Sequence, residues 1–156
     1  MNTIKTARIV GAFFLIAMVA SLAGGFWLDS IIAAPDTLDK VSAQETQMAL
    51  AALLELLNGL AVIGIAVMMF PILKKQDEAL ALGYVALRFM EAALIVAALC
   101  IPLALIPLGQ ESVAADVAGA AALQGAGTSL LAARTVIAGQ MLGIFFGLGA
   151  LVLFYL

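Results

Sequence analysis

Long apolar runs separated by short polar segments dominate the 156-residue chain. A helix that crosses the roughly 30 Å hydrocarbon core needs about 20 mostly apolar residues, because it rises about 1.5 Å per residue and satisfies its own backbone. Four runs meet this requirement, at about residues 9–28, 48–73, 79–107 and 130–156. The pattern predicts an all-α polytopic membrane protein, with four transmembrane helices in a bundle that forms a single membrane domain over residues 1–156.

The amino-acid composition is typical of a membrane protein and excludes several classes of function. Hydrophobic residues make up 65% of the chain and charged residues only 11%, too few charges to cover a water-soluble domain. With no histidine and one cysteine, the chain cannot build a zinc–histidine site, bind haem through histidine or form an internal disulfide. We therefore expect no cofactor and no metal site. The net charge of -3 argues against a nucleic-acid partner, which requires a clustered basic surface.

The first apolar run also has some features of a cleaved signal peptide. It follows Lys5 and Arg8 and contains Ser21-Leu22-Ala23, with small residues on either side of a leucine as at a cleavage site. The apolar part of a signal peptide is usually about 7–15 residues long, whereas this run continues to Trp27, a residue type that anchors helices at membrane interfaces. We therefore interpret the run as a retained helix.

Basic residues near the span ends predict the orientation of the protein. Lys5 and Arg8 precede the first span, and Lys74 and Lys75 lie between the second and third spans. The other two connections contain a single lysine, Lys40, among several acids. Because lysine and arginine concentrate on the cytoplasmic side, we expect a multi-pass arrangement with both termini in the cytoplasm.

Three connections follow from this topology: a cytoplasmic loop at 74–78 and outer loops at 29–47 and 108–129. Ser42 and Glu45 have the spacing of a capping box, which predicts a short helix leading into the second span. The second outer loop is alanine-rich with two glycines near its end, which predicts a weak interfacial helix broken before the fourth span.

Six polar side chains inside the predicted spans are the strongest functional signal. A charged group at the bilayer centre costs about 2.5–3.5 kcal/mol even on lenient insertion scales, so groups inside the bundle must compensate it. Glu55 lies roughly 10 Å below the outer edge and Glu91 roughly 18 Å from the inner edge, so the two carboxylates reach a similar depth. The predicted polar layer comprises Glu55, Asn58, Arg88, Glu91, Arg134 and Gln140.

Two interpretations of this layer remain open. It is a self-satisfied network that fixes the helix register, or it lines a polar pocket or an ion and proton path. In the second case the arginines would hold an anionic group and the acids a cation or proton. An enzyme is not expected, because the chain has no histidine to activate a serine or cysteine and its predicted spans hold no aspartate pair.

Small residues recur every four positions on the fourth span and, less regularly, on the first. Such strips let another helix approach closely. We expect the first and fourth helices to pack together through them, with contact to a second protomer as the alternative. The strips comprise Thr135, Gly139, Gly143 and Gly147 on the fourth span and Ala17, Ser21 and Gly25 on the first.

Four short motifs occur along the chain: RIVG at 8–11, LRFMEA at 87–92, and LLAAR at 130–134 followed by GIFFGLG at 143–149. Together they resemble the bacterial membrane family known as domain of unknown function 4386 over nearly the whole chain. The resemblance implies a bacterial inner-membrane protein without an established activity. Members usually continue beyond the position of Leu156 into further membrane helices. The resemblance therefore applies to the N-terminal four-helix portion of the family. It implies that this chain is a short variant of the family, a truncated form or an incompletely identified sequence.

These features support two hypotheses of function. The first is a small structural or accessory protein of the lipid bilayer, present as a homo-oligomer or within a larger membrane complex. The second is a small transporter or ligand-binding membrane module, in which the polar layer lines a midplane cavity. An interior completely filled by side chains would favour the first hypothesis, and a cavity among the second, third and fourth helices would favour the second.

Overall fold

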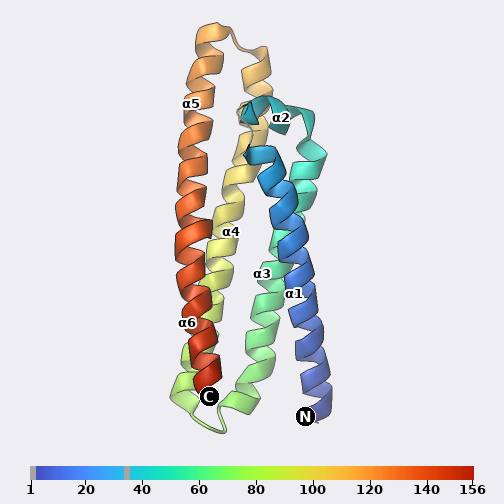
Figure 1. The fold of residues 1–156 in the computed structure, drawn as a ribbon, viewed down its shortest axis with the longest axis vertical. Coiled ribbons are helices and arrows are strands. Elements are labelled where there is room, and N and C mark those ends of the chain that lie inside the picture. The colour runs from blue at the N-terminus through green and yellow to red at the C-terminus, as the bar shows by residue number, and fades with distance from the viewer. Residues whose placement is uncertain (1–2, 34–35) are drawn as a thin grey trace.

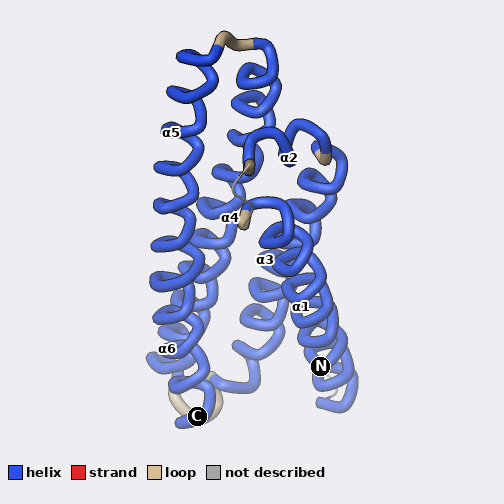
Figure 2. The backbone as a smooth tube through the Cα atoms, turned by 45° about the horizontal axis from the view of Figure 1, so that its top comes forward, coloured by secondary structure: helices blue, strands red, loops and turns tan. Residues whose placement is uncertain are grey.

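The computed structural model describes residues 3–33 and 36–156, and its described part is helical without any strand (Figure 2). The predicted all-α fold is therefore confirmed. Residues 34 and 35, which belong to the first predicted outer loop, lie outside the described part. The elements along the chain are α1 (Thr3–Ile32), α2 (Thr37–Ala43), α3 (Glu45–Leu73), α4 (Glu78–Ala114), α5 (Val117–Arg134), η1 (Thr135–Met141) and α6 (Leu142–Tyr155).

Among residues 3–33 and 36–156, four helical segments are long and apolar enough to cross a membrane: Ile4–Ile32, Glu45–Leu73, Glu78–Ala114 and Val117–Tyr155. The last combines α5, η1 and α6 into one continuous rod. The shortest segments have 29 residues, or about 44 Å at a rise of 1.5 Å per residue. All four therefore extend beyond a hydrocarbon core of roughly 30 Å.

The spans run antiparallel, as Figure 1 shows. α1 packs along α3, α3 along α4, and α4 along the rod, so α1 and the rod are the outer members of the array. The two chain ends lie at the same end of the bundle, together with the turn between α3 and α4. α1 and the rod therefore do not pack against each other along their length.

The second outer connection differs from the expectation. α4 continues to Ala114 and α5 starts at Val117, so the segment predicted as an outer loop, 108–129, is helical almost throughout. The expected break before the fourth span is absent, because α5 continues directly into η1 and α6. Gly127, one of the two glycines expected to break the helix, is buried, and a Cβ there would lie 3.3 Å from Leu38 of α2. Tertiary contact therefore outweighs the low helix propensity of glycine at this position.

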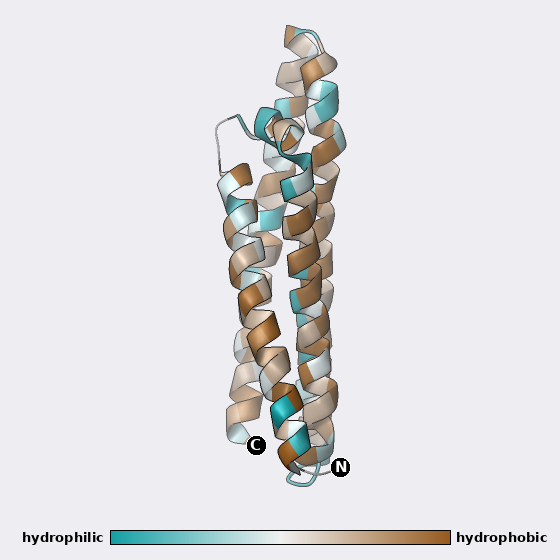
Figure 3. Ribbon diagram, turned by 90° about the vertical axis from the view of Figure 1, so that its right-hand side faces the viewer, coloured by the Kyte–Doolittle hydropathy of each residue, from teal (hydrophilic) through white to brown (hydrophobic). Residues whose placement is uncertain are grey.

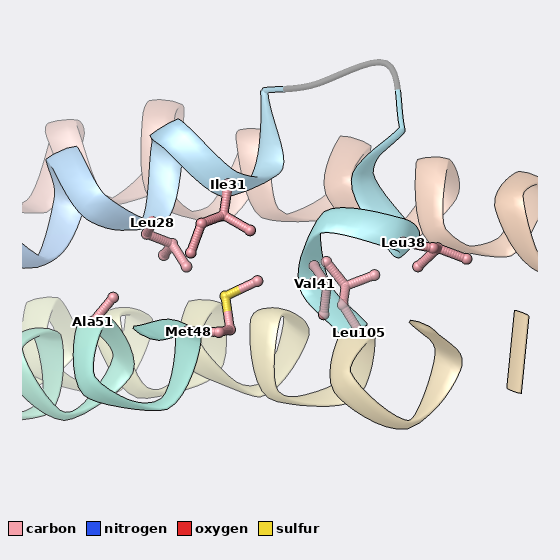
Figure 4. Close-up of a cluster of buried hydrophobic side chains, with 7 residues drawn as sticks. All are labelled: Leu28, Ile31, Leu38, Val41, Met48, Ala51 and Leu105. Atoms are coloured by element: carbon pink, nitrogen blue, oxygen red, sulfur yellow. The ribbon is translucent and has the colours of Figure 1, made fainter. Parts of the chain in front are cut away.

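α2 folds back across one end of the bundle. The short helix predicted ahead of the second span is therefore present, although α3 has no side-chain hydrogen bond at its N-terminus and the predicted capping box does not form. Leu38 and Val41 of α2 are fully buried. Their cluster contains Leu28, Ile31, Leu38, Val41, Met48, Ala51 and Leu105 (Figure 4).

Gly109 of α4 marks a close approach of α2 to the bundle. A Cβ atom on Gly109 would lie 2.7 Å from the carbonyl oxygen of Leu38 and 3.2 Å from the backbone nitrogen of Ser42. These backbone atoms cannot move aside unless α2 shifts. We therefore expect Gly109→Ala to lower the free energy of unfolding by about 1–3 kcal/mol in detergent unfolding titrations.

The control for this variant is Gly83→Ala on the same helix. A Cβ at Gly83 would meet nothing within 4 Å, so the substitution should be neutral or slightly stabilising because alanine favours the helix. Equal unfolding midpoints for the Gly109 variant, the Gly83 variant and the wild type would contradict the close approach of α2.

Candidate functional site

A buried ion pair lies on the inward face of α4. Arg88 Nη1 donates a hydrogen bond to Glu91 Oε2 at 2.6 Å. The two residues are only 6% and 4% exposed. Their i,i+3 spacing thus brings them together, as the sequence predicted. Because the guanidinium and the carboxylate neutralise each other, the pair adds no net charge to the interior.

Two aromatic rings and a glycine surround the Arg88 guanidinium. Its Cζ atom lies 5.3 Å from the ring centroid of Tyr84 on α4 and 5.4 Å from that of Phe146 on α6, which are cation–π distances. A Cβ on Gly149 would lie 3.2 Å from Arg88 Nε and 3.3 Å from Cζ, so a residue without a side chain lets α6 pack this closely.

Sequence reasoning missed these three neighbours of Arg88. Tyr84 precedes Arg88 by four residues, so the helical period could have placed the two on one face of α4. Phe146 and Gly149 belong to another helix, and no pattern within the chain indicates which α6 residues meet α4.

A second set of polar side chains lies nearer the α2 end of the bundle. Glu55 and Asn58 lie three residues apart, on one face of α3. Arg134, the last residue of α5, has its Nη1 atom 3.6 Å from Oδ1 of Asp29 on α1. The Asp29 side chain is 69% exposed, so solvent weakens this contact. Within the described ranges, no cation lies within ion-pair distance of Glu55.

Two buried guanidinium nitrogens have no hydrogen-bond partner in the described part of the chain. They are Nε of Arg88 and Nε of Arg134. A buried polar group without a partner costs about 1–3 kcal/mol. These two donors are therefore not satisfied by any other described residue.

A cleft of about 630 Å³ lies between α1 and the η1–α6 part of the rod. Its walls are mostly apolar, with α1 on one side and the rod on the other, while α3 and α4 supply the polar groups. Residues that define its two walls and its polar floor include Ala17, Ser21, Asn58, Arg88, Glu91 and Gly143.

A smaller chamber of about 190 Å³ adjoins the cleft. Glu55, Asn58 and Arg134 provide its polar lining, and Gly25 of α1 forms part of its wall. The chamber and the cleft share several lining residues, among them Ser21 and Asn58. The two spaces therefore meet at the level of Asn58.

Gln140 does not join the predicted polar layer. The residue is exposed on the rod and lines neither the cleft nor the chamber. It lies in η1, a π-helix. The prediction used only the depth of Gln140 along the span, and depth does not show which face of a helix a residue occupies. Of the six predicted polar residues, five line the cleft or the chamber: Glu55, Asn58, Arg88, Glu91 and Arg134.

The two small-residue strips do not pack together as expected. A Cβ on Gly139, Gly143 or Gly147 would meet nothing within 4 Å, so this face of the rod is open. α1 instead packs on α3, where a Cβ on Gly24 would lie 3.0 Å from Leu54 Cβ. Contact of the open strip with a second protomer stays a prediction.

The other residues of the two predicted strips lie at separate places. Thr135 is exposed, Ala17 and Ser21 line the cleft, and Gly25 lines the chamber.

No metal-binding group is formed by the described residues, since nowhere among them do three or more His, Cys, Asp or Glu side chains gather so that they could hold an ion. The groups that can bind a ligand are therefore the amide, guanidinium and carboxylate groups of the cleft and chamber. Such groups bind polar head groups by hydrogen bonds and charge.

The four apolar spans and the polar groups enclosed between them define a polytopic helical membrane protein. A family model described as "Domain of unknown function (DUF4386)" matches residues 9–156. The chain belongs to this family, which confirms the resemblance carried by its sequence motifs. The comparisons with curated proteins and with solved structures found no match.

Proposed function

We propose that this protein is a ligand-binding membrane module, acting as a binding protein or a small transporter, that takes an amphiphile into the cleft between α1 and the rod. The observation that carries the proposal is the cleft itself. Its volume of about 630 Å³ lies within the roughly 300–1,000 Å³ of small-molecule sites, which are typically apolar with a few polar groups. Asn58, Arg88 and Glu91 supply those polar groups.

The position of the cleft supports entry from the bilayer. α1 packs along α3 and the rod along α4, so the space between α1 and η1–α6 opens sideways in a membrane. An apolar chain can then enter without crossing a polar surface. Arg88 and Glu91 balance each other, which favours a head group without excess charge, because an unpaired charge at this depth is costly. The proposal assigns no catalytic step to these residues.

We further propose a bacterial inner-membrane location with both termini in the cytoplasm. Lys74 and Lys75 lie in the turn between α3 and α4, at the same end of the bundle as Lys5 and Arg8. Figure 3 shows hydrophilic residues at both ends of the bundle, around α2 as well as near the chain termini. The positive-inside rule supports the assignment of this end to the cytoplasm.

A phenylalanine placed inside the cleft tests the proposed function. Gly143 lines the cleft, and a Cβ there would meet nothing within 4 Å, so a larger side chain can occupy the space without displacing the backbone. We expect Gly143→Phe to reduce the amount of co-purified amphiphile at least about tenfold, the effect of some 1.4 kcal/mol of lost affinity. Native mass spectrometry of protein released from lipid nanodiscs measures this retention.

Gly147→Phe provides the matched control. Gly147 lies one turn further along the same helix, is equally open, and lines neither the cleft nor the chamber. It should retain the amphiphile at the wild-type level. If both variants retain it equally, or if the wild type retains none, the proposed function is wrong.

The second candidate function is a structural or accessory role, favoured by the open face of the rod. Gly139 and Gly147 line neither the cleft nor the chamber and a Cβ on either would meet nothing within 4 Å, and the polar Gln140 is exposed on the same rod. Small residues and an amide at membrane depth suit a helix of a second copy. If this role is correct, Gly147→Phe should convert oligomers to monomers in single-molecule photobleaching in vesicles, whereas the ligand-binding role predicts no such change.

A further inference from the structure

Two opposite charges face the small chamber without touching each other. Glu55 comes from α3 and Arg134 from the end of α5, and both line the space of about 190 Å³. No ion pair joins them in the described part of the chain. Each charge lies in a helix that crosses the membrane, where charges normally pair with one another or with a bound group.

The existing contacts leave both groups with binding capacity. Among the described residues Glu55 has no ion-pair partner, and a carboxylate has about four acceptor positions. In the part of the chain that the structure describes, the one ion pair of Arg134 is with the largely exposed Asp29, at 3.6 Å, and its buried Nε has no partner. A guanidinium has five donors in a planar fork that fits carboxylate or phosphate oxygens. The chamber thus offers one acceptor site for a cation and one donor site for an anion.

A ligand that carries both charges matches this arrangement. Its ammonium group would donate to Glu55, and its anionic oxygens would accept hydrogen bonds from Arg134. Such a ligand has no net charge, so the filled chamber would also have none. A purely anionic head group would leave Glu55 without a cation, and a purely cationic one would leave Arg134 without an anion.

The connection with the cleft indicates where the rest of the ligand lies. Ser21 and Asn58 line both spaces, so a head group in the chamber can continue into an apolar chain in the cleft. The walls of the cleft are mostly apolar and suit such a chain. A free zwitterion would fill only the chamber, whereas an amphiphile would fill both spaces.

We propose that Glu55 and Arg134 recognise the zwitterionic head group of an amphiphile, with a primary ammonium on Glu55, an anionic oxygen group on Arg134, and the apolar chain in the cleft. This inference rests on the proposed function and adds the class of ligand. The phosphoethanolamine head group of a lipid carries the required pair of charges and has no net charge, because its phosphate is a diester. Free phosphoethanolamine carries the same two groups, with additional negative charge on its phosphate monoester.

Competition between two single-chain lipids tests the head-group assignment. Lysophosphatidylethanolamine carries the ammonium and the phosphate, and lysophosphatidylglycerol with the same chain carries only the phosphate. We expect the wild-type protein in mild detergent to bind the first at least about tenfold more tightly, since hydrogen bonds between charged groups are the strong ones. Free phosphoethanolamine should bind far more weakly than the lipid, because it cannot use the cleft.

Charge-neutralising variants assign the two ends of the head group. Glu55→Gln should bind both lipids alike, because only the ammonium loses its partner. Arg134→Gln should weaken both lipids at least about tenfold, because both carry the phosphate. The controls Glu111→Gln and Lys40→Gln remove the same charges from exposed positions outside the chamber and should keep the wild-type preference.

The outcomes separate this inference from the proposed function. If the wild type binds both lipids equally while Gly143→Phe still removes them, the cleft binds amphiphiles but the zwitterion assignment is wrong. If free phosphoethanolamine binds as tightly as the lipid, the apolar chain of the lipid does not contribute by binding in the cleft, and the amphiphile assignment is wrong. The comparison of the two lipids uses the wild-type protein alone. It therefore tests the inference even if Glu55→Gln fails to fold.

Discussion

Arg88→Leu is expected to lower the free energy of unfolding by about 3–5 kcal/mol, the usual cost of removing one partner from a buried ion pair. Glu91 is 4% exposed and its carboxylate accepts a hydrogen bond from Arg88 at 2.6 Å. Without the guanidinium, the carboxylate would stay in an apolar interior with no cation beside it. Unfolding titrations in mixed detergent micelles measure the loss.

The double variant Arg88→Leu with Glu91→Leu should recover most of this stability, because it removes both charges together. We do not expect complete recovery, since Arg88 also contacts the rings of Tyr84 and Phe146. Equal damage from the single and double variants would contradict the view that the pair mainly neutralises itself. Lys75→Leu at an exposed position is the control and should change stability little.

The spans and the ion pair could be predicted because each depends on local sequence. A membrane-crossing helix needs one uninterrupted apolar run, and such runs are visible without knowledge of any partner. Arg88 and Glu91 are three residues apart on one helix, so helical geometry alone brings them within reach. The same applies to Glu55 and Asn58 on α3.

The faces of the fourth span could not be predicted in the same way. The π-helical segment Thr135–Met141 changes the angular relation between residues before and after it. Depth along the span places Gln140 level with the other polar residues but does not show its face, and the residue is exposed. The choice of α3 as the partner of α1 depends on the close approach at Gly24, and small residues occur on several helices. Their spacing indicates that a helix can approach closely, but it does not identify which helix does so.

Leu38→Ala should lower the free energy of unfolding by about 2–5 kcal/mol, as large-to-small changes at completely buried positions do. Leu38 is 0% exposed and belongs to the cluster that docks α2 onto the bundle. The loss would come from missing dispersion contacts and the cavity left behind. Leu151→Ala is the matched control, because Leu151 is 66% exposed and should tolerate the change in the same unfolding titration.

The Leu38 variant also distinguishes stability from ligand binding. Leu38 lines neither the cleft nor the chamber, so the folded fraction of the variant should retain the wild-type amount of amphiphile per molecule. Gly143→Phe should show the reverse pattern, with bound amphiphile lost and little change in unfolding, because a Cβ at Gly143 meets no neighbour. If both variants lose stability and ligand together, docking of α2 and the shape of the cleft are coupled, and the cleft cannot be treated as a site independent of α2.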